Sequence, residues 1–476
     1  MRSSNGHVAM STRLNSLGIS FWSRFHHTGD LSDISLAITN KQQAIQLTPH
    51  GHPNMPLWLN NLGNSFRARF RQTDNLSDLS EAISNQQQAV QLTPNSHPHM
   101  PTWLNNLGLS FHSRFHHMGN VSDLSEAIST QQRAVQLTPD GHPKMPEFLK
   151  SLGLSFQCRF DYTDNYADAC AAASAFQKSA TTFGPPSLRF ESARLWAKLS
   201  MTHDLSHSLT AYGIAIDLMS EIADIGSTIE QRHTHLIKIS TLTTSAASVA
   251  FAQGETKKAL EWLEQGRCLV WSQLNQLRTP LDHLRGHDEH LAQRFLDISG
   301  PLEASGSRSG FGGLGIDAPL SQKMSLQDEA HRHIILSRQW SDLLDEIRSI
   351  PQFHDFLRPP QTSDLLKHLP RDGIVILVNV EEARCDALAL VPSSDIPIHI
   401  ALKDFTCKEA SELRGRLQRF LSSHRVRTRE VNRGICPAPR PDAENQSEIH
   451  FVLGALWVRV VRPILDGLAF SVSFLS

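Results

Sequence analysis

Hydrophobic residues in the first part of the chain recur with helical spacing. One stripe holds Leu59, Leu62, Phe66 and Phe70, which stand at positions i, i+3, i+7 and i+11 of a helix. A second amphipathic pattern follows over residues 76–91, again in steps of three and four. The pattern therefore predicts two successive helices, each with one apolar face that must be buried.

Capping residues and a proline mark where the second helix begins and ends, and a glycine marks a close contact of the first. Asn75 or Ser77 can cap the second helix, because their side-chain oxygens accept from its free N–H groups. Pro94 ends it, since proline lacks the N–H that a further helical turn requires. Gly63 lies on the first stripe, where the absence of a side chain allows a neighbouring helix to come close.

Both patterns repeat at intervals of 45 residues. The first begins at Leu14, Leu59, Leu104 and Leu149, and the second at Leu31, Leu76 and Val121. A helix pair cannot bury both of its faces alone, so neighbouring copies are expected to stack into a solenoid. The first copy aligns Gly6 and Met10 with Gly51 and Met55, which predicts that the chain opens inside an inter-repeat loop.

These copies resemble the tetratricopeptide repeat over residues 14–160. The matching positions of the second copy are Leu62, Gly63, Phe66, Ala82, Ala89 and Pro94. The intervals between them are longer than in the family, and they extend its usual period of about 34 residues to 45. A longer first helix and a longer loop between repeats would account for the difference.

Later segments continue the helical pattern less regularly. We expect four repeats over 1–183 and degenerate helical repeats over 184–299. Within the second range, 188–219 can form a fifth pair packed through Trp196 and Tyr212. Residues 250–267 then read as the end of a helix, a turn at Gly254, and a helix that contains Ala259, Leu260 and Trp262.

The sequence pattern changes in the last third of the chain. A flexible Gly/Ser-rich loop is expected over 300–325, and a helix followed by a small, incomplete α/β segment over 326–476. The expected strands are 374–380, 385–390 and 396–402, followed by a helix of about 15 residues from Lys408 and a last helix over 447–468. The fold class is therefore mainly α, a tetratricopeptide-like α-solenoid followed by this segment.

Residues 255–466 are similar to the segment that leads into CHAT domains, caspase-like modules found after tetratricopeptide arrays, commonly in fungal proteins. The resemblance implies a catalytic His-Gly and a later nucleophilic Cys. The only His-Gly is His50-Gly51 in a repeat loop, and no cysteine follows Cys436. We therefore expect a CHAT-like domain truncated before its catalytic residues, and assign no catalytic residue.

The net charge, the N-terminal sequence and the cysteines bear on the class of partner and on the location that we expect. With 45 Lys and Arg against 47 Asp and Glu, the net charge of −2 gives no reason to expect nucleic acid or an anionic membrane. The basic cluster Arg425, Arg427, Arg429 and Arg433 reads as a solvated loop rather than a polyanion site. The N-terminus lacks a secretory signal, and the apolar stretch 451–476 is too charged to span a bilayer. Six scattered cysteines favour reduced thiols, so a cytoplasmic location is expected.

Three sets of reactive side chains are better explained as structure. His399 and Cys407 could form a dyad, but ordinary packing is the simpler interpretation. The string Asp168-Ala169-Cys170 belongs to the second helix of repeat four. The chain has 25 histidines, several of them periodic, but ligands must converge on one point while equivalent positions of a solenoid are spaced apart. We therefore predict no metal site and no cofactor.

Two charged positions also keep the repeat. They are Arg24, Arg69, Arg114 and Arg159 in the first helices, and Asp33, Asp78, Asp123 and Asp168 near the start of the second helices. We predict that they pair within or between repeats.

The family binds partners on the inner face of its first helices. The corresponding positions are Asn15, Asn60, Asn105 and Lys150, with Trp22, Arg67, His112 and Gln157 two turns along. An asparagine ladder can hydrogen-bond an extended peptide, although the same side chains could simply be solvated. The asparagine of the family's carboxylate clamp is matched only by Asn64, which argues against a chaperone tail as ligand.

The leading hypothesis is a non-catalytic scaffold that binds a protein or peptide in the solenoid groove. The alternatives are a truncated form of a CHAT cysteine protease regulated by its repeats, and a gene remnant without function. The sequence does not indicate the oligomeric state or the partner.

Overall fold

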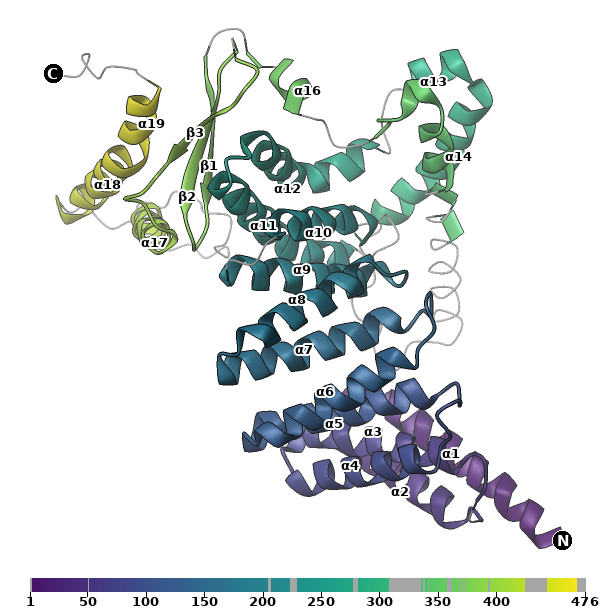
Figure 1. Ribbon diagram of the computed structural model, residues 1–476. Coiled ribbons are helices and arrows are strands. Elements are labelled where there is room, and N and C mark those ends of the chain that lie inside the picture. The colour runs from purple at the N-terminus through teal and green to yellow at the C-terminus, as the bar shows by residue number, and fades with distance from the viewer. Residues whose placement is uncertain are drawn as a thin grey trace. The chain divides into compact units, whose positions relative to one another are not determined.

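The computed structural model describes residues 2–49, 51–203, 207–222, 229–276, 281–307, 335–336, 339–340, 342–357, 362–367, 369–370, 373–392, 394–423 and 443–468. Figure 1 shows its helices and strands. The chain divides into two compact units, Met1–Leu218 and Met219–Ser476, and each is described by itself. None of the described helices is both long and apolar enough to cross a membrane.

The first unit consists of antiparallel helix pairs, as the 45-residue pattern predicts. The four repeats comprise α1 (Arg2–Thr28) and α2 (Leu31–Gln46), α3 (Met55–Thr73) and α4 (Leu76–Gln91), α5 (Met100–Met118) and α6 (Val121–Gln136), and α7 (Met145–Thr163) and α8 (Tyr166–Thr181). A fifth pair, α9 (Pro186–Thr202) and α10 (Ser208–Ile222), follows. The expected packing residues of that pair, Trp196 and Tyr212, are both buried.

The helix limits have the local causes that the sequence indicates. Asn75 caps α4, because its Oδ1 accepts from the backbone N–H of Ser77 at 3.0 Å. The preceding residue, Asp74, closes α3 in the left-handed conformation, with a φ of 52°. Pro56 stands in the first turn of α3, where its missing N–H costs nothing.

The start of α1 differs from the expectation. Residues 2–13 were expected to include an inter-repeat loop, but α1 is helical from Arg2. Repeat one has Ser11 where repeat two has Pro56. Because serine, unlike proline, can donate its N–H and leaves room for a preceding turn, the helix continues toward the N-terminus.

Neighbouring repeats share their apolar cores. One cluster joins Phe70, Leu79 and Ile83 of repeat two to Leu107 and Phe111 of repeat three. Each of these side chains is at most 6% exposed. Burial of one such side chain is worth about 1.5–3 kcal/mol, so the contact between repeats supplies stability that a single pair lacks.

A column of second-helix residues fits over the glycines of the first helices. The pairs are Gly18 with Lys41, Gly63 with Gln86, Gly108 with Gln131, and Gly153 with Phe176. A Cβ on Gly63 would lie 2.7 Å from Cγ of Gln86, which confirms the close approach expected at this glycine. We call Lys41, Gln86, Gln131 and Phe176 the interface column.

Two of the three polar members of the interface column form hydrogen bonds with the next repeat. Lys41 Nζ donates to Ser65 Oγ at 2.6 Å, and Gln86 Oε1 accepts from Ser110 Oγ at 2.7 Å. Gln131 is fully buried, and neither of its amide atoms has a hydrogen-bond partner among the described residues. The column therefore differs in chemistry from repeat to repeat while its packing position stays the same.

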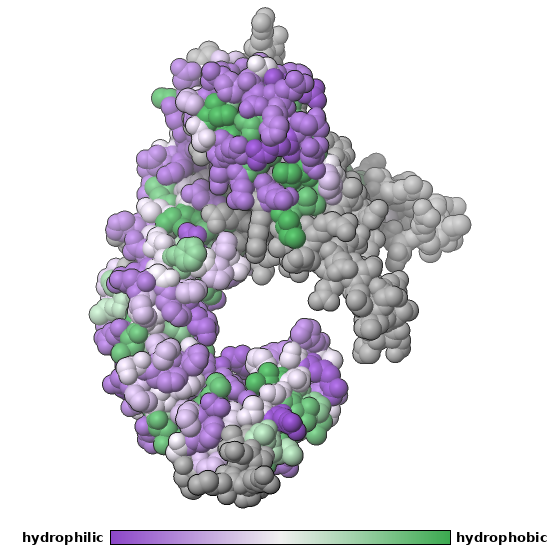
Figure 2. Space-filling model, turned by 90° about the vertical axis from the view of Figure 1, so that its right-hand side faces the viewer, coloured by the Kyte–Doolittle hydropathy of each residue, from purple (hydrophilic) through white to green (hydrophobic). Residues whose placement is uncertain are grey.

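The stacked pairs of the first unit curve toward their first helices. Successive first helices contact one another, from α1 with α3 to α7 with α9, whereas no described second helix packs to that extent against the next one. The repeats in the lower half of Figure 2 follow this curve, and their visible surface is mostly hydrophilic or mixed. The first helices therefore form the concave side of the unit.

The second unit begins with helices. They are α11 (Ile229–Ala252), α12 (Thr256–Gln276), α13 (Asp282–His287), α14 (Glu289–Ser307), a short 3₁₀ turn (Pro351–Phe353) and α16 (Thr362–Lys367). The turn predicted at Gly254 lies between α11 and α12, with a φ of 78°. Residues 300–307 were expected in the flexible loop but belong to α14, where Leu302 is fully buried in an apolar cluster. Residues 308–325 lie outside the described residues.

A three-stranded antiparallel sheet follows, in the order β1 (Val375–Val380), β2 (Cys385–Leu390) and β3 (Ile398–Ala401). It confirms the three predicted strands. The chain continues through α17 (Cys407–Ser423) and α18 (Ala443–Leu456), a π-helical segment (Trp457–Val461) and α19 (Arg462–Gly467). The basic loop around Arg425–Arg433 lies outside the described residues.

Helices cover both faces of the sheet (Figure 1). On one face, Asn379 Nδ2 donates to the Thr244 carbonyl of α11 at 3.0 Å. On the other face, Cys385, Ala387 and Ile400 pack in a cluster with apolar residues of α17, α18 and α19. The period of two along each strand thus separates a polar contact with α11 from an apolar core on the opposite side.

Candidate functional site

The predicted ladder lies on the first helices of the four repeats, the concave side of the first unit. Its residues are Asn15, Asn60, Asn105, Lys150, Trp22, Arg67, His112 and Gln157. The three asparagines are buried, with exposed fractions of 6%, 4% and 1%. The other five are half-buried. The asparagines therefore stand deeper than a solvated ladder would, and the other five form its accessible part.

One asparagine of the ladder forms a hydrogen bond between two repeats. Asn60 Oδ1 on α3 accepts from Asn106 Nδ2 on α5 at 3.0 Å. The Oδ1 atoms of Asn15 and Asn105 are buried and have no hydrogen-bond partner among the described residues. An unsatisfied buried polar atom costs about 1–3 kcal/mol, so these positions are poorly explained by packing alone.

The second row of the ladder carries unsatisfied polar atoms as well. Trp22 Nε1, Arg67 NH1 and His112 Nε2 are buried atoms without a hydrogen-bond partner within the described ranges. Burial and the nearby charge of Arg71 lower the pKa of Arg67 to about 10, while Glu147 acts in the opposite direction. Because that pKa remains far above 7, Arg67 is a cation whose hydrogen-bonding capacity is incompletely used.

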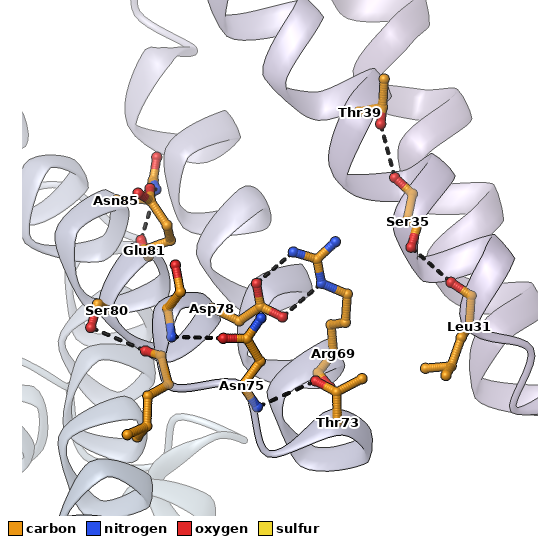
Figure 3. A network of polar contacts seen from close by, with 12 residues as sticks. Leu31, Ser35, Thr39, Arg69, Thr73, Asn75, Asp78, Ser80, Glu81 and Asn85 are labelled. Atoms are coloured by element: carbon orange, nitrogen blue, oxygen red, sulfur yellow. Dashed lines mark hydrogen bonds and ion pairs between the residues drawn. The ribbon is translucent and has the colours of Figure 1, made fainter.

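The periodic charges pair within each repeat, which confirms the prediction. Arg69 Nε donates to Asp78 Oδ2 at 2.7 Å and its NH2 to Oδ1 at 2.5 Å (Figure 3). The same two-pronged contact joins Arg24 to Asp33, Arg114 to Asp123, and Arg159 to Asp168. Each aspartate is almost fully buried. These charges therefore join the two helices of a repeat rather than facing a partner.

The recurring loop histidines also have structural contacts. His52, His97 and His142 each accept at Nδ1 from the backbone N–H two residues later, at 3.1–3.2 Å. The rings of His52 and His97 stack on Trp58 and Trp103, with centroid distances of 5.4 and 5.1 Å. Their periodicity is thus explained by the shape of the loop between repeats.

The hypothetical dyad of His399 and Cys407 is not assembled. His399 Nε2 lies 2.8 Å from Asp386 Oδ1, and its ring stacks on Phe251 of α11 at 4.7 Å. Cys407 begins α17, a helix on the opposite face of the sheet. Arg384 occupies the same Asp386 carboxylate through two hydrogen bonds at 2.6 and 2.7 Å. His399 therefore belongs to a polar contact between sheet and helix.

Cys170 likewise has no place in a nucleophilic site. It lies on α8 two residues after Asp168, whose carboxylate is taken by Arg159. Among the described cysteines, Cys158, Cys170, Cys385 and Cys407 are free thiols.

The structure does bring one group of metal-binding residue types together. His112 and His116 lie one turn apart on α5, and Cys158 comes from α7. One potential ligand atom from each lies within 4.8 Å of the others. Periodicity did not predict this group, because only equivalent positions of the repeats recur, whereas these three residues occupy different positions of two adjacent repeats.

Comparisons with known proteins do not indicate a function. No family model and no curated protein matches the sequence. Among solved structures, the TPR-like repeats of a kinesin light chain-type protein from Podosopora anserina are 13% identical, with a TM-score of 0.34 over 44% of this chain and 97% of that chain. A thermophilic TPR protein from Thermus thermophilus is 14% identical, with a TM-score of 0.31 over 47% of this chain and 96% of that chain. At these scores the likeness carries no argument, and the fold rests on the helix pairs themselves.

Proposed function

We propose that the chain is a non-catalytic scaffold that binds an extended peptide of a protein partner along the concave side of its repeats. The observation that carries the proposal is the ladder itself. Five of its eight residues, Asn15, Trp22, Arg67, Asn105 and His112, hold a buried polar atom that no described residue satisfies. Hydrogen-bonding groups left unpaired along one face are what a docked backbone would complete.

The geometry of the repeats suits an extended ligand. Equivalent ladder positions recur once per repeat on helices that contact each other directly. An extended chain lying across α1, α3, α5 and α7 would meet the same kind of group at regular intervals. The side chains of Trp22, Arg67 and His112 are half-buried, so part of each is accessible to a ligand on this side.

Arg67 indicates the chemistry of the partner. Its guanidinium is a cation with an unsatisfied NH1, and a carboxylate can accept two parallel hydrogen bonds from such a group. The partner peptide is therefore proposed to carry an acidic side chain that meets Arg67. Gln157 occupies the equivalent position in repeat four, so the cationic contact is specific to repeat two.

The proposal is tested by selecting binders from a random-peptide phage library on the purified chain, with a metal chelator present throughout. We expect peptides enriched in Asp and Glu. Arg67→Gln, which installs the residue of repeat four, should weaken their binding at least about tenfold, the loss expected for one charge-assisted hydrogen bond. The matched control is Gln87→Ala, which alters an exposed residue of α4 and should leave the affinity unchanged.

Two results would contradict the proposal. The first is a selection without enrichment, or peptides that bind Arg67→Gln and Asn105→Ala as well as the parent chain. The second is cleavage of the selected peptides that stops after thiol alkylation, which would favour the alternative, a cysteine peptidase of the CHAT type.

A further inference from the structure

The structure assigns a zinc-type metal site to His112, His116 and Cys158, at the contact between repeats three and four. Two imidazoles and one thiolate form a ligand set of borderline softness, which suits Zn²⁺ with a fourth position left for water or another ligand. The site shares His112 with the proposed peptide-binding ladder, whereas His116 and Cys158 belong to the metal site alone.

The positions of the three side chains follow from the repeat geometry. His112 and His116 are four residues apart on α5, so they lie on the same face of one helix, and their ring centroids are 4.6 Å apart. Cys158 lies on α7, one residue beyond Gln157, the equivalent of His112 in repeat four. Packing of α5 against α7 brings the thiol to the two rings.

The distances are close to those of a tetrahedral site. Ligand atoms around tetrahedral Zn²⁺ lie about 3.3–3.6 Å apart, given Zn–N bonds of about 2.0–2.1 Å and Zn–S bonds of about 2.3 Å. Here Cys158 Sγ is 3.8 Å from His116 Nε2, and no pair of potential ligand atoms in the group exceeds 4.8 Å.

His112 is already in the state that a metal needs. Its Nε2 is buried and has no hydrogen-bond partner among the described residues. Burial, with a smaller contribution from His116, lowers the pKa of His112 to about 4.

The thiol becomes a ligand by losing its proton. Burial and the negative charge of Asp161 raise the pKa of the Cys158 thiol, and a free cysteine thiol is already mostly protonated at pH 7. Binding of the cation breaks the S–H bond, forms the metal–sulfur bond and releases one proton to the buffer. The charge of Asp161 that disfavours the thiolate also attracts the cation.

Other repeats supply the control variants. Cys158→Ser installs the residue found at the equivalent positions 23 and 113, and His112→Gln installs that of position 157. His26 is the counterpart of His116 in repeat one, but its neighbours in the corresponding positions are Trp22 and Ala68, which offer no ligand atom. His26→Gln is therefore a matched control that removes a histidine from the same helix position.

The test is titration of the tag-free, chelator-stripped full chain with Co²⁺, followed by displacement with Zn²⁺. We expect one Co²⁺ per chain, with a near-ultraviolet thiolate-to-cobalt charge-transfer band and the visible spectrum of a tetrahedral ion. Cys158→Ser should abolish the charge-transfer band, while His112→Gln and His116→Gln should each weaken binding at least about tenfold. His26→Gln should bind as the parent chain does.

The outcomes separate a metal site from incidental binding. A titration without a saturable thiolate band, or a band that survives Cys158→Ser, would overturn the assignment. Far-ultraviolet circular dichroism of each variant shows whether it keeps the helical fold. In addition, calorimetric titration in buffers of different ionisation enthalpy should detect release of about one proton per metal ion.

Discussion

Arg69 and Asp78 join the two helices of repeat two through a bidentate contact that is largely withdrawn from water. The side chain of Asp78 is 4% exposed and that of Arg69 is 27% exposed. The guanidinium also lies over the Phe66 ring, with its Cζ 5.6 Å from the ring centroid. Because the aspartate is the more buried partner, the two residues are not energetically equivalent.

Arg69→Ala should therefore lower the free energy of unfolding more than Asp78→Ala does. It leaves a buried carboxylate without a partner, at a cost of about 2–4 kcal/mol, whereas Arg69 left alone can turn toward water. Denaturant unfolding of both single variants and the double variant should give a coupling energy above about 1 kcal/mol. The pair Arg194 and Glu191, whose acidic partner is less buried than Asp78, serves as a control and should couple by less than about 0.5 kcal/mol. Zero coupling between Arg69 and Asp78 would show that the pair does not clamp the helices.

Gly63→Ala should destabilise the array by about 1–3 kcal/mol, although alanine is normally the better helix former. Its Cβ would lie 2.9 Å from the Ala82 carbonyl oxygen, which is backbone and cannot rotate away. The measurement is the midpoint of urea unfolding. Gly415→Ala in α17 is the control, since no atom lies within 4 Å of its added Cβ, and it should be neutral or stabilising. Equal effects of the two changes would contradict the close approach.

Lys41 should make stability depend on alkaline pH. Burial lowers the pKa of Lys41 to about 8 in the folded chain from 10.5. Between these values the unfolded chain binds more protons, so the free energy of unfolding should rise with pH from about 8 to about 10.5, by up to about 3 kcal/mol. Below about pH 8 the amine is charged in both states and the penalty of burying that charge is fully present.

The check is urea unfolding of the parent and of Lys41→Gln across this pH range. Glutamine is the residue of repeats two and three at this position. The variant should be more stable at pH 7, and the difference between the two proteins should shrink as pH rises to about 10.5. A difference that stays constant with pH would mean that Lys41 keeps an ordinary pKa.

Asp74→Gly should stabilise repeat two by about 0.5–1 kcal/mol. Asp74 has a φ of 52°, and Gly119 occupies the equivalent position in repeat three with a φ of 70°. A side chain is strained in this left-handed conformation, and glycine is not. Thermal unfolding of Asp74→Gly and of the exposed control Asp140→Gly separates relief of strain from a general effect of glycine. A loss of stability in Asp74→Gly would show that the aspartate side chain makes a compensating contact.

Periodic features could be read from the sequence, and irregular ones could not. The helix pairs, the Asn75 cap and the Arg69–Asp78 pair all follow from spacing, because stacking gives equivalent residues equivalent surroundings. The helical start of α1 was missed because its cause is a missing proline at Ser11. Residues 300–307 were missed because burial of Leu302 overrides a Gly/Ser-rich composition.

The candidate sites, too, could be predicted only where they follow the repeat. The ladder positions could be predicted from spacing, but the depth of Asn105 depends on how closely two helices approach, which spacing alone does not give. The cluster of His112, His116 and Cys158 breaks the period, so its detection required the packing of α5 on α7. A histidine pair one turn apart, with a cysteine near the corresponding position of the next repeat, was the available signal.

The interface column makes the junctions between repeats unequal in stability. Along the chain its members pass from a buried amine at Lys41, through Gln86 with its hydrogen bonds and Gln131 without them, to the fully buried ring of Phe176. A solenoid opens first at its weakest junction, because each repeat contacts only its neighbours. Amide hydrogens at the junction that Gln131 occupies should therefore exchange earlier than those at the junctions of Gln86 and Phe176.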